Sequence, residues 1–120
     1  MKFSRRGLKE QLPLRAFIVS VSALDALVAL DSSPAHIGVA LGVPVITLFG
    51  PALPEFVGPA GPTARIIQEG TFECRPCTQT ICVHPDASCM DAISTDGVFA
   101  ATLEALSARR SSQPGQVLRA

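Results

Sequence analysis

The sequence predicts an α/β fold, a Rossmann-like parallel sheet with flanking helices. Two short runs of apolar or β-branched residues, 26–30 and 45–49, are separated by one helical segment and little else. Neither run alternates with polar residues, which is typical of strands that are buried on both faces. Proline and glycine bracket the helical segment between them. A strand–helix–strand unit of this kind predicts parallel strands joined by a right-handed crossover.

The N-terminal part of the chain predicts a helix and then the first strand. The helix is expected over Leu14–Ser22, with Pro13 near its first turn, where a missing N–H costs nothing. The strand is expected over Ala26–Leu30 and ends at the polar residue Asp31.

The central part predicts the crossover helix and the second strand. The helix is expected over Pro34–Leu41, because Gly42 and Pro44 follow it as stop signals. The second strand is expected over Val45–Phe49.

The C-terminal half is less regular in sequence. Residues 50–62 are rich in proline and glycine and predict a long loop at the end of the second strand. A third strand is expected at residues 64–68. Residues 70–92, called the cysteine loop below, carry all four cysteines. A last helix is expected from Thr95 or Asp96 to about Ser107.

Length and charge limit the class of protein. The 120 residues suit one domain at residues 1–108, followed by a flexible tail at residues 109–120. Ten Lys and Arg balance ten Asp and Glu, so nothing in the net charge favours nucleic acid as a partner. The uncharged run at residues 16–24 is far shorter than the ~18–20 residues of a membrane helix. We expect a cytoplasmic protein, with a peripheral position at the inner membrane as the alternative.

The junction after the first strand has the composition of a phosphate site. Ligands of open parallel sheets lie at the carboxyl ends of the strands. The unpaired amides and the positive dipole end of a helix N-terminus favour phosphate there, and the two serines can add hydroxyl donors. The second strand brings a Gly-Pro pair to the same rim. The predicted binding residues are Asp31, Ser32, Ser33, Pro34, Ala35, His36, Gly50 and Pro51.

The residues alone leave other interpretations open. Asp31 repels phosphate, so it could accept hydrogen bonds from a sugar or ribose hydroxyl, or cap the turn. Residues 31–33 could do no more than cap the helix. A lone histidine such as His36 is more often packed or solvated than a ligand-binding group. Arg65 and Arg75 fit ordinary surface charges.

Three segments of the chain resemble the family 9 glycosyltransferases, the bacterial lipopolysaccharide heptosyltransferases and their relatives. The segments are Asp31-Ser32-Ser33-Pro34-Ala35-His36-Ile37, Ala40-Leu41-Gly42-Val43-Pro44-Val45-Ile46 and Leu48-Phe49-Gly50-Pro51. The cysteine loop also resembles a cysteine-rich stretch of many members, through Cys74-Arg75-Pro76-Cys77 and Cys89-Met90-Asp91-Ala92-Ile93. The resemblance covers roughly residues 8–107, and the block at 31–51 is its specific part.

The resemblance implies the C-terminal half of a GT-B fold, in which two Rossmann-like domains face each other across a cleft. That half holds the nucleotide diphosphate of an activated sugar, here expected to be ADP-heptose, for transfer to the lipopolysaccharide inner core. Residues 31–36, 50 and 51 would then line the donor site. The catalytic general base is unknown and is expected in an N-terminal domain. That domain is expected to be missing or to lie on a separate chain, so this chain alone should be inactive.

Two positions depart from the family pattern. Ser33 stands where the family usually has Gly, so its side chain is expected to weaken or retune donor binding without abolishing the site. Ala52 stands where relatives often carry a hydroxyl residue.

The cysteine loop is the second candidate site. Its spacing, Cys74-x2-Cys77-x4-Cys82-x6-Cys89, begins with a pair that can share one tetrahedral metal ion, with zinc as the candidate. The later spacings fit no common zinc module, so reduced structural thiols, disulfides and redox chemistry stay open. If the four cysteines carry the function of the chain, the alternative is a small non-catalytic interaction module that a metal ion holds together.

Overall fold

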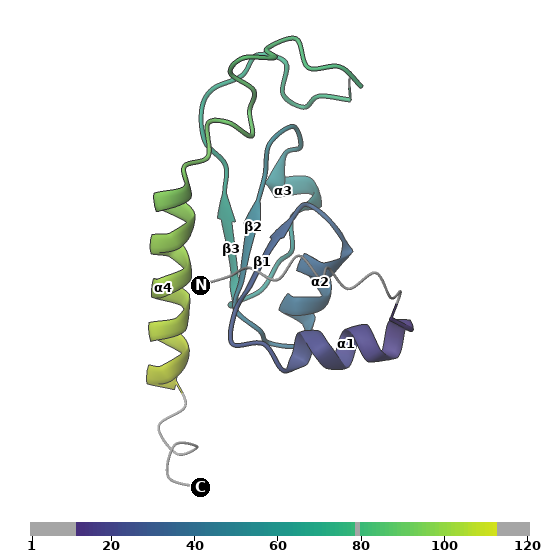
Figure 1. The fold of residues 1–120 in the computed structure, drawn as a ribbon, viewed down its shortest axis with the longest axis vertical. Helices are drawn as coiled ribbons and strands as arrows, with labels where there is room; N and C mark the ends of the chain where they lie inside the picture. The colour runs from purple at the N-terminus through teal and green to yellow at the C-terminus, as the bar shows by residue number, and fades with distance from the viewer. Residues whose placement is uncertain (1–11, 79, 113–120) are drawn as a thin grey trace, which may run out of the picture.

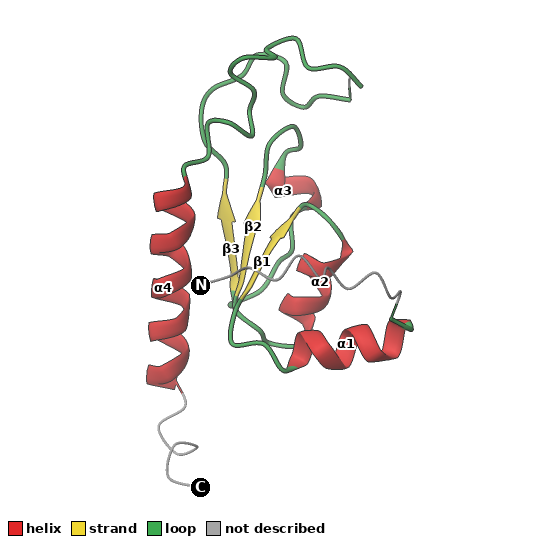
Figure 2. Ribbon diagram, viewed as in Figure 1, coloured by secondary structure: helices red, strands yellow, loops and turns green. Residues whose placement is uncertain are grey.

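The computed structural model describes residues 12–78 and 80–112 and confirms the α/β class (Figures 1 and 2). Three parallel strands form one sheet in the order β1-β2-β3. The elements in chain order are α1 (Leu14–Ser22), β1 (Leu27–Leu30), α2 (Ser33–Ala40), β2 (Val45–Leu48), α3 (Pro54–Val57), β3 (Ala64–Ile67) and α4 (Thr95–Ser112).

The core lies around the central strand β2. Helix α2 packs against β1 and β2 on one face of the sheet, and α4 packs against β2 on the other face (Figure 1). Val45 and Ile46 are both 0% exposed, as expected for a strand covered on both faces. Burying each such side chain contributes about 1.5–3 kcal/mol. The strand that leads to the rim is therefore firmly held by apolar burial.

Two glycines fix the position of α2. A Cβ on Gly38 would lie 2.6 Å from Cγ2 of Val45 and 3.2 Å from Cδ2 of Leu27, so only glycine lets the helix approach the sheet this closely. Gly42 follows the helix with φ +76°, the left-handed conformation that glycine adopts without strain. Together they set where the N-terminus of α2 meets the rim.

The predicted elements agree with the structure to within a residue or two at most ends, with two corrections. Residues 50–62 were expected as loop throughout, but they contain the short helix α3. The flexible tail was expected from residue 109, but α4 continues to Ser112. Alanine, leucine and arginine at residues 105–110 are strong helix formers, and Arg109 donates a 2.7 Å hydrogen bond to the carbonyl of Leu24. Residues 113–120 lie outside the described residues.

The outer edge of β1 is open in the described part of the chain. There β1 pairs only with β2, and the side chains of Val28 and Leu30 are 43% and 57% exposed. The face of β1 opposite α2 is thus apolar but uncovered.

No helix among the described residues has the length and apolarity required to cross a lipid bilayer.

Candidate donor-binding rim

The carboxyl ends of β1 and β2 place the predicted binding residues side by side. Leu30 is the register partner of Leu48, so residues 31–33 and residues 49–51 leave the sheet together. Neighbouring strands lie about 4.8 Å apart. The two segments therefore lie side by side at one edge of the sheet.

The turn into α2 carries no side-chain cap among the described residues. Ser32 is the N-cap residue in an extended conformation, with φ −163° and ψ 170°. Its hydroxyl donates to the carbonyl of Leu30 at 3.2 Å and not to a helix amide. Ser32 therefore occupies the N-cap position, but its side chain does not cap the helix. The first turn keeps the positive end of its dipole toward the solvent.

Exposure differs among the residues of this turn. Asp31, Ser32, Ser33 and His36 are exposed. Ala35 is 0% exposed and its amide already donates to the carbonyl of Ser32 at 3.1 Å. Ala35 was predicted to bind the ligand, but its amide is not a free donor, because it is already bonded to Ser32. Ser33 and His36 keep exposed polar side chains, whereas the Ser32 hydroxyl already donates to Leu30.

Ser33 fits the turn without backbone strain. It is the first residue of α2, and no residue other than glycine has a positive φ in the described part of the chain. The glycine of the family pattern is therefore not required here by the backbone. A serine in place of that glycine would affect binding through the size of its side chain beside the bound anion.

An open cavity of about 570 Å³ lies beside the turn, between β1 and α1. Asp31 and Ser32 form its polar end, and the rest of the lining is mostly apolar, with side chains such as Phe17 and Leu27. The turn is accordingly not buried beneath other elements, and a ligand of nucleotide size has room next to it.

Gly50 lies on the covered side of the rim. A Cβ at this position would lie 2.5 Å from Sδ of Met90 and 3.0 Å from Sγ of Cys89, so the cysteine loop packs directly onto its backbone. Its carbonyl accepts hydrogen bonds from Nε of Arg75 at 2.8 Å and Nε2 of Gln68 at 3.2 Å. Gly50 therefore anchors the cysteine loop in this structure and is not open to a ligand.

Pro51 is exposed, and its carbonyl also holds the cysteine loop. The amide of Cys77 donates to it at 2.9 Å. The predicted binding residues thus divide into an open group at 31–36 and an anchoring pair at 50–51.

Arg75 has a role that the sequence did not reveal. It was taken as a surface charge, but its guanidinium donates to three backbone carbonyls, those of Gly50 at 2.8 Å, Gly70 at 3.0 Å and Glu69 at 3.3 Å. It also lies 5.2 Å from the ring centre of Phe72. Arg75 thereby ties the cysteine loop to the ends of β2 and β3. Its place between two cysteines was the only signal, and it does not identify the partners.

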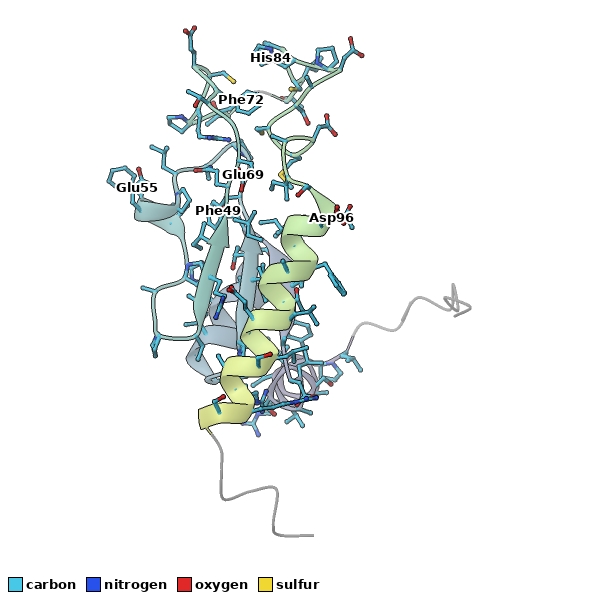
Figure 3. All side chains as sticks on the ribbon, turned by 90° about the vertical axis from the view of Figure 1, so that its left-hand side faces the viewer. Phe49, Glu55, Glu69, Phe72, His84 and Asp96 are labelled. Atoms are coloured by element: carbon cyan, nitrogen blue, oxygen red, sulfur yellow. The ribbon has the colours of Figure 1, made fainter. Side chains whose placement is uncertain are left out.

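The cysteine loop rises beyond the carboxyl ends of the strands (Figure 1). Figure 3 shows Phe72 and His84 in this extension, above Phe49 at the end of β2. The two rings meet edge to face, with centres 5.9 Å apart. Cys74, Cys77 and Cys89 are half-buried, Cys82 is exposed, and all four are free thiols.

The described residues place no three His, Cys, Asp or Glu side chains where they could hold one metal ion. The zinc site therefore stays a prediction.

One ionisable group in the cysteine loop is perturbed by its surroundings. The hydroxyl and the amide of Ser88 donate to Oδ2 of Asp91 at 2.8 Å and 2.9 Å. These hydrogen bonds, the hydroxyl bond first, lower the pKa of Asp91 below its ordinary value of 3.8. The turn that carries Cys89 is thus held by an ionised carboxylate.

Residues 2–87 match the family described as glycosyltransferase family 9 (heptosyltransferase), which is more than half of the chain. The chain belongs to this family. The family 9 domain is 32% identical over 74 residues to lipopolysaccharide heptosyltransferase 1 of Pseudomonas aeruginosa, which covers 62% of this chain and 21% of that protein. It is 33% identical over 63 residues to lipopolysaccharide heptosyltransferase 2 of Salmonella typhimurium and to that of Escherichia coli K12, covering 52% of this chain and 18% of each relative.

The family 9 domain spans only about a fifth of the length of these curated relatives. No solved structure matches it significantly.

Proposed function

We propose that this domain holds the diphosphate of a nucleotide-activated sugar at residues 31–36 and thereby serves the donor half of a glycosyl transfer. The observation that carries the proposal is the exposed, uncapped N-terminus of α2 at the carboxyl rim of a parallel sheet in a family 9 chain. Helix N-termini at this position of open α/β sheets are established phosphate sites.

The residues of the turn have distinct roles in this proposal. The helix N-terminus stabilises the diphosphate and the negative charge that develops on it as the sugar leaves, and the side chain of Ser33 lies beside the anion. His36, exposed in the first turn of α2, adds a donor to a phosphate oxygen. Asp31 accepts a hydrogen bond from a sugar or ribose hydroxyl and lies beyond the anion. In this arrangement the turn supplies leaving-group stabilisation.

Deprotonation of the acceptor hydroxyl requires a general base, which we assign to another part of the transferase. The names of the relatives support a heptose as the sugar and lipopolysaccharide as the acceptor, and we further propose that ADP activates the heptose and that the inner core accepts it. The open apolar edge of β1 is consistent with further transferase segments, on this or a separate polypeptide, that pack beside it. Without them we expect donor binding but no turnover.

Calorimetry with ADP tests the proposal, because ADP carries the diphosphate without the sugar. We expect saturable binding to the folded chain at about 1 mM ADP or below. His36→Ala should weaken binding about 5–10-fold, which corresponds to about 1–1.4 kcal/mol, the contribution of one ordinary hydrogen bond. His84→Ala is the matched control, because this second histidine lies in the cysteine loop and should leave affinity unchanged. No binding of ADP at this concentration would refute the donor site, and equal affinities of the two variants would remove His36 from it.

A further inference from the structure

The cysteine loop is long and only its base is firmly held. Its described residues, 68–78 and 80–94, contain no helix or strand, whereas loops beyond about 12–15 residues without their own structure are uncommon in compact domains. The tip of the loop carries Ile81, Cys82 and Val83. The side chains of Ile81 and Val83 are 82% and 56% exposed, so apolar burial does little to order the tip. Another interaction is needed to fix the tip.

The base of the loop is fixed by contacts already described. Arg75 holds three carbonyls at the ends of β2 and β3, and the amide of Cys77 donates to Pro51. Cys89 lies against the backbone of Gly50. Cys77 and Cys89 thus lie at anchored positions and Cys74 directly precedes the anchoring Arg75, while Cys82 lies on the exposed tip.

All four thiols line one cavity of about 270 Å³, whose wall also includes Arg75 and Pro51. We propose that Cys74, Cys77, Cys82 and Cys89 bind one zinc ion in this cavity and that the ion crosslinks the tip of the cysteine loop to its base. Thiolates are preferred zinc ligands, and four of them complete a closed structural site. The proposal is independent of donor binding at residues 31–36.

Two further contacts suit a thiolate site. The amide of His84 donates to Sγ of Cys82 at 3.4 Å, and hydrogen bonds to sulfur stabilise metal-bound thiolates. Four thiolates around one divalent ion leave excess negative charge, which the guanidinium of Arg75 in the cavity wall offsets. Each thiol that binds the ion releases its proton to solvent.

The cavity must contract when the ion binds. The described residues hold no three ligand groups within reach of one ion, whereas sulfurs of a tetrahedral site with 2.3 Å bonds lie about 3.8 Å apart. Cys82 can move inward with the least loss of packing because it is exposed. Metal binding and ordering of the loop tip are therefore one event.

Cobalt titration of the full chain tests the site. The protein is stripped with chelator under reducing conditions, and Co²⁺ is added as a spectroscopic substitute for zinc. We expect one Co²⁺ per chain, with thiolate-to-cobalt charge transfer and the strong visible bands of a tetrahedral site. Zinc should displace the cobalt, and the four thiols should react with a disulfide reagent only after the metal is removed.

Three variants show which residues form the site. Outer-shell changes commonly cost about 10–100-fold in metal affinity, so we expect a loss of that size for Arg75→Gln and a larger one for Cys82→Ser. Cys82 is exposed, so its substitution leaves the fold intact. His84→Ala is the control, because it keeps the amide that donates to Cys82, and its cobalt affinity should equal that of the unmodified chain.

The proposal is overturned if Co²⁺ gives only the weak spectrum of an aqueous ion, or if zinc leaves the reactivity of the four thiols unchanged. A stable disulfide between any two of the four, formed in preference to metal binding, also overturns it. A site that survives Cys82→Ser at full affinity would contradict the four-cysteine ligand set.

Discussion

Replacing Arg75 by methionine should release the cysteine loop from the sheet. Methionine keeps much of the aliphatic length but removes the donors to Gly50, Gly70 and Glu69. The bond to Gly50 is partly buried and should contribute about 1.5 kcal/mol, and the two exposed bonds about 0.5 kcal/mol each. We therefore expect a loss of about 2–3 kcal/mol in the free energy of docking the loop.

Two measurements follow this loss. The chain has no Trp or Tyr, so urea unfolding is followed by far-ultraviolet circular dichroism. Hydrogen exchange of the Cys77 amide, which donates to Pro51, reports loop docking directly. Arg65→Met is the matched control, because Arg65 makes one exposed ion pair, 2.7 Å from Glu104, which should contribute only about 0–1 kcal/mol. If Arg75→Met changes neither the unfolding free energy nor the exchange of Cys77 more than Arg65→Met does, Arg75 is not the anchor.

Three further predictions concern single positions. Gly42→Ala should lower the free energy of unfolding by about 1 kcal/mol, because φ is +76° there while no atom lies within 4 Å of the added Cβ; an unchanged urea midpoint would contradict this. The pKa of Asp91 is lower in the folded chain than in the unfolded chain, so its stabilising contribution is complete above about pH 4 and disappears as the pH falls through the folded value. The amide shift of Ser88 should titrate with a midpoint below 3.8, and in Asp91→Asn it should not titrate; a midpoint at or above 3.8 would show that the hydrogen bonds are absent in solution. Ser33→Gly should strengthen ADP binding a few-fold by removing a side chain beside the diphosphate, and weaker binding would show instead that the hydroxyl is a needed donor.

The sequence predicted the strands and their parallel arrangement well, because local signals coincide there. Pro34 and Gly42 bracket α2, and the apolar runs on either side have no competing helical pattern. The same signals placed the turn at residues 31–36 on the carboxyl rim. What they could not give is the direction of single hydrogen bonds, such as that of the Ser32 hydroxyl back to Leu30.

Long-range contacts were not predictable from one chain. Nothing local to Gly50 indicates that Met90 and Cys89 cover it, because the contact closes a long loop of irregular sequence. Arg75 likewise resembles any surface arginine until its three carbonyl partners are placed. The C-terminal end of α4 was missed because its contact with Leu24 comes from a distant part of the chain.

Nuclear magnetic resonance of the ¹⁵N-labelled chain, titrated with ADP, tests the donor site most directly. Saturable shift changes that are largest for the backbone amides of Ser33 and His36, with little change at Cys77, are the result we predict. Shift changes centred on the cysteine loop, or none at saturating nucleotide, would contradict a diphosphate site at the start of α2.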